Sequence, residues 1–182
     1  LKAGTTVCLK GPFVDKPRYQ GSGSSQVNST KVETIAEQIV NYDLKVMDDP
    51  EKADVVLFFF GLDEIAESEG ADRMSIDVPE YQIKELEELT VYNKHIIGVM
   101  SAGSSVKMPW LGCLQALLHG YLTGQAGASA LLDIITGKEV PTGKLSESYP
   151  FAYADCSIAM ASGAQAASQA AQLVLLDNDF AR

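Results

Sequence analysis

The sequence lacks any apolar run near the ~18 residues that a membrane-spanning helix needs, so a helical membrane protein is excluded. It is also poor in basic residues, because 14 lysines and arginines stand against 24 aspartates and glutamates, for a net charge of −10. That balance opposes binding to phosphate backbones and to anionic lipid surfaces. We therefore expect no nucleic-acid partner, no membrane partner and a neutral ligand.

Cysteine and histidine are scarce as well. Three cysteines at wide spacing, Cys8, Cys113 and Cys156, indicate neither a disulfide framework nor a metal knuckle, and they are typical of buried thiols. The two histidines, His95 and His119, lie at the start of one apolar run and inside another, which favours structural roles. No secretion signal is visible at the N-terminus, which favours the cytoplasm but leaves the compartment open.

What the chain does contain is an alternation of apolar runs with helical patterns. This alternation predicts an α/β fold with a doubly wound, mostly parallel sheet and helices on both faces. We place one domain over residues 1–155 and a tail or linker of unknown role over residues 156–182. The expected elements cover residues 5–9, 30–41, 54–60, 79–93, 95–101, 113–122 and 126–136.

Two of the predicted helices carry end signals. Thr30 and Glu33 have the spacing of a capping box, and Gly137 follows an apolar helical segment as a C-cap. The first of these helices has one apolar face, made of Val32, Ile35, Ala36, Ile39 and Val40.

Acidic residues follow the most apolar run of the chain. Residues 53–61 read ADVVLFFFG, which predicts a buried strand, and residues 67–73 read ESEGADR directly after it. In open α/β sheets ligands bind beyond the carboxyl ends of the strands. Crowding of Glu67, Glu69 and Asp72 would raise the proton affinity of one carboxylate and make it a proton donor, with Arg73 paired to Asp72. A solvated acidic turn is the alternative.

Further polar segments have weaker signals. The loop of Gly21, Ser22, Gly23, Ser24 and Ser25 lacks nucleotide-motif spacing, so it is a polar turn or the lining of a sugar pocket rather than a phosphate cradle. Residues 101–105 follow a strand as a nucleophile would, but without the G-x-S-x-G order of a serine hydrolase. Trp110 is a packing anchor or a platform for a sugar ring.

Several motifs in order resemble the α/β sandwich domain of glycoside hydrolase family 3. The resemblance spans about residues 5–155, and its strength lies in the ordered set rather than in any single motif. The matching segments are residues 18–25, 60–73, 78–82, 101–106, 108–110, 124–125 and 142–150.

This resemblance implies a retaining β-glycosidase that uses two carboxylates. The nucleophile would be an aspartate on a separate TIM-like barrel, and the family's E-G-x-D-R segment makes Glu69 the acid/base, with Glu67 as fallback. The implied substrate is a terminal β-D-glucosyl residue, and the sequence leaves xylose and N-acetylglucosamine open as alternatives. The implied reaction needs no metal or organic cofactor. The loop from Gly21 would shape the pocket or the interface with the barrel.

The chain is too short to hold that barrel as well, since a (β/α)₈ barrel needs roughly 200 residues or more. We therefore expect the barrel elsewhere in the same protein or in another chain. Two alternatives stay open: a non-catalytic carbohydrate-binding or interface module of the same fold, and a nucleotide-binding α/β domain, which sheet topology alone would favour.

Overall fold

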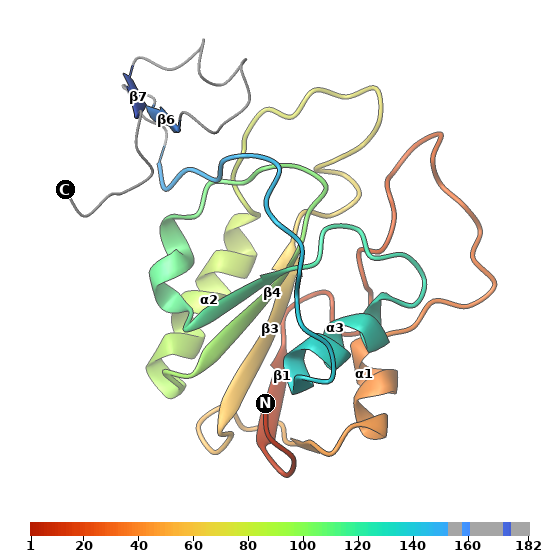
Figure 1. Ribbon diagram of the computed structural model, residues 1–182, viewed down its shortest axis with the longest axis vertical. Coiled ribbons are helices and arrows are strands. Elements are labelled where there is room, and N and C mark those ends of the chain that lie inside the picture. The colour runs from red at the N-terminus through yellow and green to blue at the C-terminus, as the bar shows by residue number, and fades with distance from the viewer. Residues whose placement is uncertain (153–157, 161–172, 176–182) are drawn as a thin grey trace.

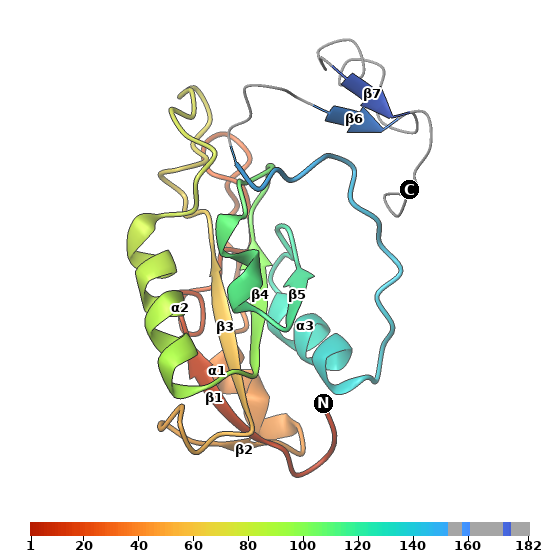
Figure 2. The ribbon, with the colours of Figure 1, turned by 90° about the vertical axis from the view of Figure 1, so that its left-hand side faces the viewer.

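The computed structural model describes residues 1–152, 158–160 and 173–175. Its main sheet is parallel throughout, and the strand order is β2-β1-β3-β4-β5 (Figures 1 and 2). These strands are β1 (Thr6–Lys10), β2 (Lys45–Val46), β3 (Val55–Gly61), β4 (Ile96–Ser101) and β5 (Ala116–His119). A separate parallel pair is formed by β6 (Ile158–Met160) and β7 (Leu173–Leu175). The domain boundary predicted near residue 155, and most of the predicted tail, lie outside the described residues.

Helices cover both faces of the main sheet, which confirms the predicted fold class. Helices α1 (Ile35–Gln38) and α3 (Gly127–Thr136) pack on one face, and α2 (Glu80–Tyr92) packs on the other (Figure 1). Two short 3₁₀ turns, η1 (Ile39–Asn41) and η2 (Pro109–Cys113), follow α1 and β4. Within the described part of the chain, no helix is long and apolar enough to cross a membrane.

Strand β3 lies at the centre of the sheet, and its side chains are shared between two cores. Val56, Phe58 and Phe60 point to the α2 side, whereas Leu57 and Phe59 point to the α1 and α3 side. Each of these five side chains is at most 2% exposed. A strand covered on both faces has no solvent side, which explains why its sequence is continuously apolar instead of alternating.

The first predicted helix is shorter than its sequence pattern indicates. The capping box is formed by Thr34 and Glu37, not by Thr30 and Glu33, and α1 begins at Ile35. Glu33 instead accepts hydrogen bonds from the N–H and hydroxyl of Ser129 in the first turn of α3.

Other details of the local prediction had mixed outcomes. Val40, assigned to the buried face of the first helix, is 77% exposed because the chain there has already changed to a 3₁₀ turn. Strand β2 was missed, because its two residues are both exposed. Gly137 is confirmed as the C-cap of α3, with a left-handed φ of 77°.

The direction of the chain through the sheet reverses between β1 and β3. From β1 the chain moves outward to β2, whereas from β3 it moves the other way through β4 to β5. The loops that follow β1 and β3 therefore leave neighbouring strands at the same edge and separate there. Such a reversal is the usual ligand position in doubly wound sheets.

Candidate functional site

An open hollow of about 430 Å³ lies at this reversal, at the carboxyl edge of the sheet. It brings together the serine and glycine loop after β1, the acidic loop after β3 and the turn after β4. Its lining comprises Arg18, Gly21, Ser22, Ser24, Ser25, Glu67, Ser68, Glu69, Gly103, Ser104 and Leu122. Most of the residues singled out from the sequence thus share one surface. We call residues 62–79, between β3 and α2, the acid loop.

The serine and glycine loop holds the acid loop directly. Ser22 and Ser68 form an isolated parallel bridge, and the Glu69 N–H donates to the Ser22 carbonyl at 3.0 Å. The Ser24 N–H donates to the Glu69 carboxylate. A backbone N–H that could have faced a phosphate therefore faces a protein carboxylate, which argues against the phosphate-cradle interpretation.

Gly23 makes this contact sterically possible. Its φ is +112°, and a Cβ there would lie 2.4 Å from the Glu69 Cβ and 2.6 Å from its Oε2. Only glycine combines that backbone conformation with so close an approach. The glycine thus serves the placement of Glu69.

Glu69 is exposed, and its carboxylate faces the hollow. The hydrogen-bonding groups of Ser24, its side chain first and its backbone N–H second, lower the pKa of Glu69. Crowding was predicted to raise the proton affinity of one of the three carboxylates. Glu69 is not that carboxylate in this domain, because the hydrogen-bond donors of Ser24 outweigh the opposing effect of desolvation on its pKa.

Glu67 has the opposite environment. One carboxylate oxygen accepts the Gly103 N–H at 2.8 Å, and the other accepts the Ser104 hydroxyl. The Arg18 Nη2 lies 3.9 Å from the first oxygen, and the Glu67 side chain is only 11% exposed. The structure therefore turns Glu67 inward and leaves Glu69 facing outward.

Arg73 does not pair with Asp72, contrary to the prediction. It donates to the Ser75 carbonyl at 2.9 Å, to the Ser104 hydroxyl and to the Ser105 carbonyl at 3.2 Å. Asp72 is exposed. The acceptors of Arg73 are already held in place by the fold. Pairing with Asp72 would instead require ordering a solvated carboxylate, which costs side-chain entropy. Arg73 consequently ties the acid loop to the turn after β4.

Gln82 fixes the point where the acid loop begins. Its fully buried side-chain amide accepts from the Gly61 N–H at 2.8 Å and donates to the Gly61 carbonyl at 3.0 Å. This pair of bonds satisfies the last backbone groups of β3 from the side of α2. Gln82 lies in the segment 78–82 that carries the family resemblance, but no role was predicted for it. A polar residue on the buried face of a helix was the signal that could have indicated one.

Trp110 lies outside the hollow and is 4% exposed. Its ring packs edge-on against Phe60, with the ring centroids 4.9 Å apart. Of the two predicted roles, this placement corresponds to the packing anchor. An indole that is 4% exposed offers too little surface to stack on a sugar ring.

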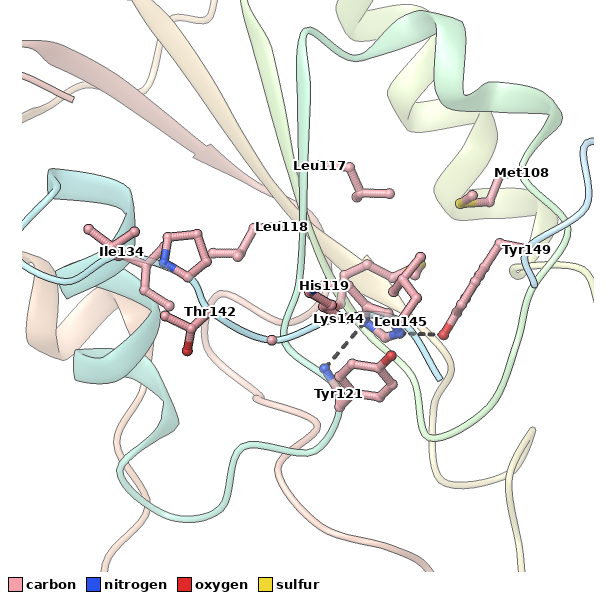
Figure 3. A pocket seen from close by; sticks show the side chains of 14 residues that line it. Met108, Leu117, Leu118, His119, Tyr121, Ile134, Thr142, Lys144, Leu145 and Tyr149 are labelled. Atoms are coloured by element: carbon pink, nitrogen blue, oxygen red, sulfur yellow. Dashed lines mark hydrogen bonds between the residues drawn. The ribbon is translucent and has the colours of Figure 1, made fainter. Parts of the chain in front are cut away.

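A second cavity of about 600 Å³ is lined by the edge strand β5 and by residues 140–145 (Figure 3). Its lining is mainly apolar, and Figure 3 shows His119 joined to Tyr121 and Tyr149 by hydrogen bonds. Burial lowers the pKa of His119 and raises the pKa of Tyr149, so both groups are neutral near pH 7. These contacts support the structural role predicted for His119.

No group of three or more histidine, cysteine, aspartate or glutamate side chains in the described residues could hold a metal ion. Cys8 is buried and Cys113 half-buried, both as free thiols, while Cys156 lies outside the described residues.

Comparison with known proteins agrees with this architecture. Residues 1–178 match the family model described as the glycosyl hydrolase family 3 C-terminal domain. The chain belongs to glycoside hydrolase family 3. It is 37% identical over 174 residues to thermostable beta-glucosidase B of Acetivibrio thermocellus, covering 82% of this chain and 23% of that protein.

Further relatives show how much of a family 3 protein this chain represents. It is 37% identical to an exo-alpha-(1->6)-L-arabinopyranosidase of Bifidobacterium breve, covering 79% of this chain and 22% of that protein. Among solved structures, the Bifidobacterium adolescentis GH3 beta-glucosidase aligns with a TM-score of 0.68 and 36% identity, over 74% of this chain and 23% of that one. The chain thus spans less than a quarter of the length of these family 3 relatives.

Proposed function

We propose that this domain supplies the acid/base glutamate of a retaining β-glycosidase, and that Glu69 is this residue. The nucleophilic aspartate would lie on a TIM-like barrel outside this sequence. The observation that carries the proposal is the outward-facing Glu69 carboxylate, held at the sheet reversal by Ser22 and Ser24. An exposed carboxylate on a braced loop can reach a substrate bound on a facing domain.

In this role Glu69 first protonates the leaving glycosidic oxygen and later removes a proton from the attacking water. The two carboxyl groups of such an enzyme stand about 5–5.5 Å apart across the anomeric carbon. Glu69 has a lowered pKa in this domain, so it must gain proton affinity when the site assembles. Burial beneath the barrel and proximity to the nucleophilic aspartate both act in that direction.

The test is Glu69→Gln in the complete enzyme. For a substrate with a poor leaving group we expect kcat to fall by about 10²–10⁴-fold, the usual contribution of a positioned acid/base. The loss should be much smaller for a nitrophenyl glycoside, whose leaving group needs little protonation. With the nitrophenyl glycoside, azide should restore turnover of the Glu69→Gln variant and yield a glycosyl azide.

The matched control is Glu64→Gln, because Glu64 is an exposed glutamate on the same acid loop. This variant should keep the parent activity on both substrates. If Glu69→Gln behaved like the control, Glu69 would not be the acid/base.

We further propose that the glycone is a terminal β-D-glucosyl residue. Relatives named as beta-glucosidases support this choice, whereas others are named as an arabinopyranosidase and as exo-1,4-beta-xylosidases. Comparing nitrophenyl β-glucoside, β-xyloside, N-acetyl-β-glucosaminide and α-L-arabinopyranoside at equal concentration tests it. Higher kcat/KM on any sugar other than glucose would contradict the proposal.

A non-catalytic carbohydrate-binding or interface module is the second candidate. It is favoured by the exposure and the lowered pKa of Glu69, which suit a carboxylate that only accepts hydrogen bonds from sugar hydroxyls. Such a module would bind gluco-oligosaccharide and tolerate Glu69→Gln without loss of turnover. A nucleotide-binding role is disfavoured by two carboxylates in the hollow, and ATP or NAD should leave the melting temperature of the chain unchanged.

A further inference from the structure

Arg18 is a charged residue in the interior for which the proposed function has no use. Its side chain is 2% exposed, and Nε, Nη1 and Nη2 are all buried without a hydrogen-bond partner in the described part of the chain. The nearest carboxylate oxygen belongs to Glu67, at 3.9 Å from Nη2, which is within range of ionic attraction but too far for a hydrogen bond. A buried guanidinium with unsatisfied donors is costly, so an acceptor is to be expected.

A cavity of about 20 Å³ lies against Arg18, which is room for about one water molecule. Besides Arg18, its lining includes the polar residues Glu33, Ser101 and Thr123. Buried waters typically make about three hydrogen bonds to polar groups that otherwise lack partners. The size and the lining therefore both fit a single water that accepts from the guanidinium.

We propose that Arg18, Glu67 and Ser104, completed by one water bound to Arg18, form a buried positioning node that sets the place of Glu69. The role of the node in catalysis rests on the proposed function of Glu69, whereas its structure does not. Glu67 is then a positioning residue rather than a second candidate for the acid/base.

The node joins the three loops that surround the hollow. Glu67 ties the acid loop to the turn after β4 through Gly103 and Ser104. Arg18 precedes the serine and glycine loop, and its charge lies next to Glu67. Arg73 adds a second tie, because its guanidinium donates to the same Ser104 hydroxyl that donates to Glu67.

These ties act on both segments that contact Glu69. One segment is Ser68, the residue between the two glutamates, which bridges to Ser22. The other is Ser24, whose N–H donates to the Glu69 carboxylate. If the node loosens, the acid loop and the serine loop can move apart, and Glu69 loses both its position and its hydrogen-bond donor.

The first test uses the 182-residue chain alone and measures the Glu69 carboxyl by carbon-13 NMR titration. The wild type should titrate below an ordinary glutamate, and Ser104→Ala and Arg18→Lys should each move Glu69 back toward the ordinary value. Arg18→Lys keeps the charge but loses the forked donors, so it is the milder change if Ser104→Ala unfolds. Ser146→Ala, at an exposed serine, should leave the titration unchanged. Folded variants that titrate as the wild type would overturn the node.

A crystal structure of the same chain tests the water. We expect one ordered water within about 3.2 Å of an Arg18 nitrogen, the upper range of an N–H···O bond. Direct hydrogen bonds from Arg18 to Glu67 in place of that water would overturn this part of the proposal.

The second test uses the complete enzyme and compares Glu67→Gln with Glu69→Gln. Misplacement of a catalytic group by about 1 Å can cost about 10²-fold. We therefore expect Glu67→Gln to lower kcat by roughly 10–100-fold, with little change in KM and no rescue by azide. Rescue of Glu67→Gln by azide would make Glu67 the acid/base and refute the positioning role.

The two proposals can fail separately. If Glu69→Gln keeps full activity while the Glu69 titration still responds to Arg18→Lys, the proposed function fails and the node stands. If Glu69→Gln loses activity and is rescued by azide while the titration does not respond, the node fails and the proposed function stands.

Discussion

Replacing Gly23 by alanine tests whether the serine and glycine loop places Glu69. The added Cβ would lie 2.4 Å from the Glu69 Cβ, an atom whose place is set by the backbone. Turning the Glu69 side chain cannot relieve that contact, so one of the two loops must move. Gly23 also has a φ of +112°, where an alanine is strained by about 1–3 kcal/mol.

Gly70→Ala is the matched control, because it separates strain from collision. Gly70 lies on the acid loop one residue from Glu69 and has a left-handed φ of +79°, but a Cβ there meets nothing within 4 Å. This variant should cost about 1–2 kcal/mol, the left-handed penalty of an L-residue. Gly23→Ala should cost a further 1–3 kcal/mol or so from overpacking.

The first assay is the melting temperature of the 182-residue chain. Since about 1 kcal/mol corresponds to ~2–4 °C in a domain of this size, Gly23→Ala should melt roughly 2–12 °C below Gly70→Ala. In the complete enzyme Gly23→Ala should also lower kcat by about 10²-fold on a substrate with a poor leaving group. Equal melting temperatures and equal kcat for the two variants would refute the steric role of Gly23.

Two further predictions concern the stability of the domain. Gln82→Ala leaves the N–H and C=O of Gly61 buried without the hydrogen bonds of Gln82. The free energy of unfolding, measured by chemical denaturation, should fall by at least about 2 kcal/mol. The control Gln115→Ala, at an exposed glutamine, should lower it by less than about 0.5 kcal/mol. Burial and the hydrogen bond to Asp133 raise the pKa of Tyr42 from 10.0 to about 12. The protonated hydroxyl of Tyr42 therefore stabilises the folded state fully below pH 10, and this contribution is lost as the pH rises through about 12. Tyr42→Phe should remove that loss from a plot of unfolding free energy against pH, and an unchanged plot would contradict the assignment.

Much of the fold could be predicted from local pattern. The continuous apolar run of β3 and the glycine that ends α3 each depend on neighbouring residues along the chain. Alternation of such elements was enough to predict the two covered faces. The errors occurred where a distant partner took over a local signal, as when Glu33 bonds to Ser129 in α3 instead of capping its own helix.

The candidate site was predictable in place but not in detail. The acid loop had to lie at the carboxyl edge of the sheet, because it follows a buried strand. Which glutamate faces outward depends on contacts between loops far apart in the sequence, such as those of Glu67 with Gly103 and of Glu69 with Ser24. The same limit explains the wrong partner predicted for Arg73 and why crowding does not raise the proton affinity of Glu69.

By itself, then, the sequence determined the layered α/β architecture, the family resemblance and the segment that carries the acids. Only the tertiary structure decided that Glu67 is enclosed and Glu69 is open, that Gly23 must lack a side chain, and that Arg18 lies buried near the same carboxylate. The physical reason is the parallel sheet. Its strand order places the loops after β1, β3 and β4 side by side, and the hydrogen bonds among them do not follow any local periodicity.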